Sequence, residues 1–270
     1  MVKKTRHLQL LNSLTAVGKD VFETKDVQAL AGSSPQAASN LLSRWVRDGL
    51  VDRVARGRFA LRPIGALGTR AASEDVALAV GATFVGRSHR IAFRSALEYH
   101  GLLQHPARRI IVATDTRPSL ETISGRPLRA VFENPKTLDL GALDAGYGAR
   151  VSSVERALLE AAARPELAGG IETVATALAA ADVDPHVLQK LANELGARAA
   201  LHRLGSIAEA LEIEPVAAEL EPMNAWGRLI QLDPDVEVDV VDGDDGRWRH
   251  NKWGVEWPFS VVELEETVRR

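Results

Sequence analysis

The chain has 270 residues, of which 46% are hydrophobic and 26% are charged, a composition typical of a globular protein long enough for two domains. It contains no cysteine, which excludes disulfides, thiolate zinc sites and thiol nucleophiles. No run of about 18 or more apolar residues is present, so we expect no transmembrane helix. The N-terminus is followed by an amphipathic segment and not by an apolar signal sequence, and a cytoplasmic protein is therefore expected.

The net charge of −3 is distributed unevenly along the chain. Residues 1–62 contain 11 Lys and Arg against 5 Asp and Glu, whereas the remaining residues contain 22 against 31. A small basic region joined to a larger acidic one favours a DNA-binding domain attached to a body that would not itself attract phosphate. The alternative is chance clustering of charge on a solvated surface.

The basic region has the element order of a winged helix-turn-helix domain. Its expected elements are a helix ending near Gly18, a strand at 21–23, a helix at 25–30 capped by Thr24, a turn at 31–33, a helix at 34–48, and strands at 50–54 and 58–61. The last two strands would form a hairpin with Gly57 in its turn. This order predicts the domain more specifically than any single motif within it.

The helix at 34–48 has its boundary signals in place. Ser34 can cap its first free N–H groups, Pro35 fits the first helical position, and Gly49 can end it in the left-handed conformation. Its apolar residues recur at the spacing of one buried helix face, and they are Ala38, Leu41, Leu42, Trp45 and Val46. The other face carries hydrogen-bond donors with no carboxylate before Asp48, which predicts a recognition helix in the major groove of DNA.

Eleven side chains are candidates for DNA contact. The helix and its preceding turn supply Ser33, Ser34, Gln36, Ser39, Asn40, Ser43, Arg44 and Arg47, and the hairpin supplies Arg53, Arg56 and Arg58. We expect the N-terminal members of the helix to face base edges and the hairpin arginines to contact the flanking backbone. A winged helix that contacts only protein is the alternative, but three arginines on one small ribbon would repel unless an anion lay between them.

The fold class expected for the whole chain is α+β, with a winged helix-turn-helix domain at 1–64 and a larger mixed α/β domain at 65–270. Within the second domain, 109–114 reads as a buried strand, 152–212 as a helical part, and 225–270 as terminal strands and a helix. Alternating valines at 236–240 and a returning strand at 247–255 predict a C-terminal β-hairpin. Ser95 and Ser152 each begin a capping-box pattern, Ser-x-x-Glu, at the start of a predicted helix.

Two other functions remain open on the residues alone. One predicted strand carries alternating carboxylates opposite His250 and Lys252 on the returning strand, and they are Asp233, Asp235, Glu237 and Asp239. Carboxylates so placed, above all Asp235, Glu237 and Asp239, could hold Mg²⁺ in a DNA nuclease. The same alternation is also the ordinary pattern of a half-exposed strand, and the lysine expected two residues after the acid is missing. The second domain could instead bind a small molecule. We predict no metal site, no cofactor and no catalytic residue, so the chain is not expected to be an enzyme.

Several segments of the second domain resemble the AbiEi family of antitoxins. Phe93–Leu102 is similar to the family signature Ser-Ala-Leu-x-x-His-Gly-Leu, and further similar segments are Val151–Glu160, Gly169–Glu172 and Arg203–Gly205. The resemblance covers about residues 5–212. It implies a bacterial transcriptional autorepressor that also neutralises a nucleotidyltransferase-like toxin, with double-stranded operator DNA and that toxin as partners and no membrane association.

Overall fold

The computed structural model describes residues 9–14, 16, 21–55, 57–62, 76–103, 105, 107–118, 121–123, 126–223, 229–234, 236 and 252–269. Its contacts divide the chain into two units. Unit 1 comprises Met1–Arg87, Pro118–Leu128 and Asp144–Arg150, and unit 2 comprises the other residues. The domain boundary expected between 64 and 65 falls outside the described residues. Among those described, no helix is both long and apolar enough to cross a bilayer.

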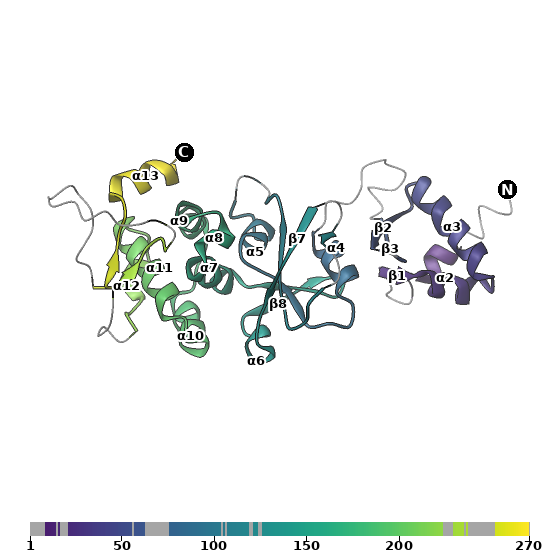
Figure 1. Ribbon diagram of the computed structural model, residues 1–270, viewed down its shortest axis with the longest axis horizontal. Helices are drawn as coiled ribbons and strands as arrows, with labels where there is room; N and C mark the ends of the chain where they lie inside the picture. The colour runs from purple at the N-terminus through teal and green to yellow at the C-terminus, as the bar shows by residue number, and fades with distance from the viewer. Residues whose placement is uncertain are drawn as a thin grey trace. The chain divides into compact units, whose positions relative to one another are not determined.

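The N-terminal elements of unit 1 follow the predicted order (Figure 1). Residues 9–14 are helical, and the next elements are β1 Val21–Glu23, α2 Thr24–Ala31, α3 Pro35–Arg47, β2 Val51–Ala55 and β3 Arg58–Leu61. The three strands form an antiparallel sheet in the order β1-β3-β2. The hairpin predicted after the third helix is therefore present, with β1 added to its β3 edge.

The boundaries of α3 are the predicted ones. The Ser34 hydroxyl accepts a hydrogen bond from Ala37 N at 3.3 Å, and Pro35 occupies the first turn. Gly49 follows the helix with a φ of +66°, and Leu50 N donates to Trp45 O at 2.9 Å. This pairing satisfies a free carbonyl of the last turn and directs the chain into β2.

The cap predicted for α2 is wrong by one residue. Glu23 is the N-cap, its backbone N donates to the Asp26 carboxylate at 2.8 Å, and Thr24 is the first helical residue. Glu23 is also the last residue of β1, so pairing of β1 with β3 fixes the point at which α2 begins.

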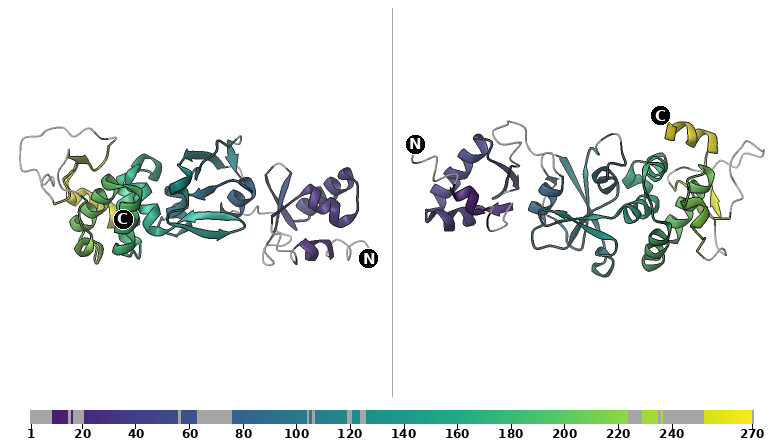
Figure 2. Two further views of the ribbon diagram at one scale, coloured as in Figure 1. Left: turned by 90° about the horizontal axis from the view of Figure 1, so that it is seen from below. Right: turned by 180° about the vertical axis from the view of Figure 1, so that it is seen from behind.

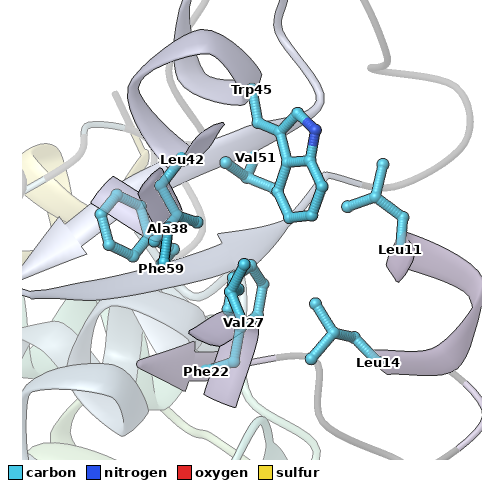
Figure 3. Close-up of a cluster of buried hydrophobic side chains, with 9 residues drawn as sticks. All are labelled: Leu11, Leu14, Phe22, Val27, Ala38, Leu42, Trp45, Val51 and Phe59. Carbon is cyan, nitrogen blue, oxygen red and sulfur yellow. The ribbon is translucent and has the colours of Figure 1, made fainter. Parts of the chain in front are cut away.

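A single hydrophobic core holds these elements together. Figure 3 shows its side chains converging from the first helix, β1, α2, α3 and the hairpin, with the Trp45 indole on α3 among them. The buried members are Leu11, Leu14, Phe22, Val27, Ala38, Leu42, Trp45, Val51 and Phe59. Burial of Ala38, Leu42 and Trp45 confirms the predicted inner face of α3 and leaves its polar face outward.

A six-stranded sheet forms the centre of the remaining fold (Figure 1). Its strands are β4 His89–Ile91, β5 Ile110–Thr114, β6 Thr122–Ile123, β7 Arg126–Phe132, β8 Ala142–Gly146 and β9 Ala149–Ser152, in the order β6-β7-β5-β4-β9-β8. β4 pairs antiparallel with β5 and parallel with β9. Every residue of β5 is buried, which confirms the interior strand expected at 109–114.

Helices α4 to α13 follow the three N-terminal helices and complete a mixed α and β fold, as predicted. They are α4 Val76–Thr83, α5 Arg94–Tyr99, α6 Pro135–Leu138, α7 Val154–Ala163, α8 Pro165–Ala168, α9 Ile171–Ala180, α10 Pro185–Leu195, α11 Arg198–Ala210, α12 Val216–Glu219 and α13 Val261–Arg269. α7 packs against α9, α10 and α11, and both views in Figure 2 show these teal and green helices side by side. Their alanine-rich faces allow this close approach.

The described part of the C-terminal segment contains one pair of short strands. β10 Ile230–Gln231 pairs in parallel with β11 Val255–Glu256, whereas most of the predicted hairpin at 236–255 lies outside the described residues. Polar side chains of α11 hold this segment: His202 contacts the carbonyls of Trp253 and Met223, and Trp257 Nε1 donates to Ser206 Oγ at 2.8 Å.

Candidate nucleic-acid interface

The outward face of α3 gathers most of the sequence-predicted contacts. Seven candidate side chains on the helix and at its cap are exposed: Ser34, Gln36, Ser39, Asn40, Ser43, Arg44 and Arg47. The helix itself contains no Asp or Glu, and both of its arginines lie in the last turn. A surface of amides, hydroxyls and guanidiniums that lacks a negative charge suits both base edges and phosphate oxygens.

Two of these side chains order each other. Gln36 Nε2 donates to Asn40 Oδ1 at 3.1 Å, one helical turn away, and both residues are exposed. The bond restricts the rotamers of two amides that could present paired donors and acceptors to a base. Ser34 Oγ accepts the capping bond and keeps its hydroxyl hydrogen free to donate.

The arginines of α3 remain available to a ligand. Arg47 lies 3.7 Å from the carboxylate of Asp48, but both side chains are more than half exposed, so the attraction between them is weak. Arg44 makes no ion pair with any described residue. The two guanidiniums therefore give the C-terminal half of the helix a positive surface.

Ser33 is placed differently from the other candidates. Its hydroxyl is buried and has no hydrogen-bond partner among the described residues, and its backbone N donates to Gln28 O at 3.2 Å. The turn before α3 holds Ser33 in this position, so its side chain does not reach the exposed face.

The three hairpin arginines do not form one cluster. Arg53 is exposed on β2 between the buried residues Asp52 and Val54. Arg56 lies outside the described residues. Arg58 is only a quarter exposed, and its Nη1 donates to the carbonyls of Ala82 at 2.6 Å and Thr83 at 3.2 Å. The expectation that Arg58 faces DNA is therefore corrected, because its guanidinium is bound to the end of α4.

The alternative metal site is not represented in the structure. Asp235, Glu237, Asp239 and His250 all lie outside the described residues, while Asp233 is buried. Within the part of the chain that is described, no group of three His, Asp or Glu side chains could hold a metal ion.

Sequence reasoning missed a buried charged cluster in unit 2. Arg90, on β4, is fully buried, and its guanidinium pairs with Glu160 and, at 2.7 Å, with Glu133. Arg156 bonds the same two carboxylates, at 2.6 Å to Glu133 and 3.0 Å to Glu160. Two arginines and two glutamates thus neutralise one another within the fold.

Ser152 and Phe93 complete the environment of Glu160. Ser152 Oγ donates to Glu160 Oε2 at 2.9 Å, and Phe93 N donates to the same oxygen at 3.1 Å. Burial alone would raise the pKa of the Glu160 carboxyl, but the guanidiniums of Arg90 and Arg156 hold it below its ordinary value. Glu160, Ser152 and Phe93 all lie in the AbiEi-like segments, which was the one signal that could have revealed the cluster.

A cavity of about 300 Å³ lies beside this cluster. Its apolar walls come mainly from Phe93, Val131 and Leu159, and Phe132, which is 75% exposed, also lines it. The charged part of the wall is formed by Glu133, Arg156 and Glu160. These charged groups already bond one another through most of their polar atoms, and Arg156 Nη1 is buried without a partner among the described residues.

Comparisons with known proteins show which family and which fold the chain resembles. No curated protein matches it. It is similar in fold to the RV2827C protein from Mycobacterium tuberculosis, whose crystal structure aligns with a TM-score of 0.60 and 18% identity over 96% of this chain and 93% of that one. Residues 9–62 match the family model "Transcriptional regulator, AbiEi antitoxin", and residues 90–212 match "AbiEi antitoxin C-terminal domain". Because the two models together span most of the sequence, the chain belongs to the AbiEi antitoxin family.

Proposed function

We propose that this antitoxin-family protein binds operator DNA through α3, with the β2–β3 hairpin against the flanking backbone, and represses its own operon. The observation that carries the proposal is the division of α3 into a buried apolar face and an exposed face of donors without a carboxylate. Measuring the affinity of the full chain for the DNA upstream of its own gene, against scrambled DNA of equal length, tests it. Equal affinities would refute sequence-specific binding.

Neutralisation of a nucleotidyltransferase-like toxin is the second part of the proposal. It rests on the family membership and on the partner that the resemblance implies. A nucleotidyltransferase-like gene adjacent to this one would be expressed alone and together with the antitoxin. Growth arrest that co-expression relieves is expected, and arrest that persists at matched toxin levels would exclude this partner.

Asn40→Ala is expected to weaken operator binding by about 1–3 kcal/mol and binding to random DNA very little, since a base contact carries sequence information and a phosphate contact does not. Titration of labelled operator and random duplexes at one salt concentration measures both affinities. Asn193→Ala is the matched control, because Asn193 is an exposed asparagine in helix α10. A uniform loss on both duplexes would reduce Asn40 to a positioning role.

Arg53→Ala is expected to reduce the steepness of the plot of log binding constant against log salt concentration by about 0.9, on operator and random DNA alike. Without the Arg53 phosphate contact, binding would release one counterion fewer. Binding isotherms over a series of salt concentrations give the slope. Arg129→Ala, at an exposed arginine on β7, is the control and should leave it unchanged. A slope equal to that of the parent protein would show that the hairpin does not contact the DNA backbone through Arg53.

A further inference from the structure

We propose that Arg58 is a positioning residue that fastens the β2–β3 hairpin to helix α4, so that α4 belongs to the DNA-binding unit. The inference rests on the proposed DNA-binding function and assigns Arg58 a role different from phosphate contact. It also makes α4, which lies beyond the segment matched by the regulator model, the support that sets the position of Arg53.

The contacts of Arg58 tie three elements together. Its Nη1 donates to Ala82 O and Thr83 O in the last turn of α4, at 2.6 and 3.2 Å. Carbonyls at a helix C-terminus lack intrahelical partners and carry partial negative charge, so a guanidinium is a favourable cap for them. Arg58 Nε also lies 3.4 Å from Glu23 Oε1 at the junction of β1 and α2. These contacts engage Nη1 and Nε and hold the guanidinium at the end of α4, so Arg58 would have to leave them to extend toward a phosphate.

Apolar packing supports the same junction. Val54 on β2 and Ala60 on β3 are buried together with Leu78 and Ala82 on α4. Residues 77–82 of α4 are all buried, so the helix is enclosed over nearly its whole length. The hairpin therefore packs on α4 through its inward side chains, while Arg53 on the adjoining position of β2 stays exposed.

Gly81 holds α4 from another side. A Cβ atom at Gly81 would lie 2.3 Å from the backbone oxygen of Tyr147, in the turn between β8 and β9. Only glycine permits so close an approach of helix and turn. Because α4 lies between this turn and the hairpin, a shift of α4 would carry the hairpin with it.

A double-mutant cycle between Arg53 and Arg58 distinguishes positioning from direct contact. Arg58→Met and Arg53→Ala should each lower affinity on the order of 10-fold and reduce the salt slope by about 0.9, since either change removes the Arg53 phosphate contact. The double variant should match the single ones, because Arg58 acts through Arg53. Additive losses, with a slope reduced by about 1.8, would mean that Arg58 itself contacts phosphate and would overturn the proposal.

A measurement without DNA separates failure of this inference from failure of the proposed function. In Arg58→Met, amide hydrogen exchange should accelerate in β2, β3 and the last turn of α4 and remain unchanged in α3, and Arg58→Lys should restore part of the protection. Unchanged exchange in the hairpin would refute the fastening role even if the parent binds DNA. If exchange accelerates in Arg58→Met relative to the parent, but neither protein binds DNA, the fastening role stands and only the proposed DNA-binding function is refuted.

Discussion

Replacing Glu160 with glutamine is expected to lower the free energy of unfolding by about 3–5 kcal/mol, the range for breaking a buried ion pair from one side. The carboxylate accepts hydrogen bonds from Arg90, Arg156, Ser152 and Phe93 N. A neutral amide leaves the fully buried Arg90 with only Glu133 as its charged partner, and it places an NH₂ group opposite existing donors. The cost therefore comes from uncompensated charge and not from lost volume.

Urea denaturation followed by circular dichroism measures the loss. Glu166→Gln provides the matched control, because Glu166 pairs with Arg164 at 2.9 Å while both side chains remain about two-fifths exposed. That surface pair should contribute less than about 1 kcal/mol. If the two variants unfold at the same urea concentration, the buried cluster does not stabilise the fold as argued.

The difference in unfolding free energy between the parent and Glu160→Gln should depend on pH, because folding changes the pKa of Glu160. Folding lowers the pKa of its carboxyl, since Arg90 and Arg156 outweigh the opposing effect of burial. The resulting stability is fully present above the unfolded value of about 4.3 and is lost as pH falls through the lower folded value. The gap in unfolding free energy between parent and Glu160→Gln should therefore be widest near neutral pH and should narrow in acid.

The order of the elements described within residues 9–62 could be predicted from sequence because their signals are local. Ser34, Pro35 and Gly49 lie within the helix they delimit or directly beside it, and Gly57 lies within the turn it makes. The apolar spacing of α3 then fixes which face is buried. Such patterns place the exposed face of the helix without any knowledge of the rest of the chain.

Other residues have roles that depend on distant partners, and sequence reasoning misplaced them. Ser95 has the pattern of a helix cap, but its hydroxyl accepts from Ile111 N of β5 at 2.9 Å. Ser152 was expected to begin the cap of α7, whereas Ser153 does so and Ser152 joins the buried cluster. Arg58 resembled its neighbours in charge and spacing, and only tertiary packing brings α4 to it. Ile111 lies 16 residues from Ser95, and Ala82 lies 24 residues from Arg58. Arg90, which donates to Ser152 Oγ in the buried cluster, lies 62 residues from Ser152.

Trp45→Ala is expected to lower the free energy of unfolding by about 3–5 kcal/mol, the range for truncating a buried tryptophan. The indole is fully buried and packs in the core that joins α3 to the first helix, α2 and the hairpin (Figure 3). Alanine leaves most of that space empty, so α3 would lose the contact that fixes its outer face. Amide hydrogen exchange in α3, compared with that in α7, reports the local loss of stability.

Loss of this anchor should also abolish the preference for operator over random DNA, because donors on an unanchored helix cannot hold a fixed register against base edges. Trp45→Phe, which keeps an aromatic ring in the core, should retain most of the preference. Asn40→Ala should lose preference with normal exchange in α3, whereas Trp45→Ala should lose both together. A Trp45→Ala protein that still discriminates operator would show that the exposed face of α3 is not what reads the sequence.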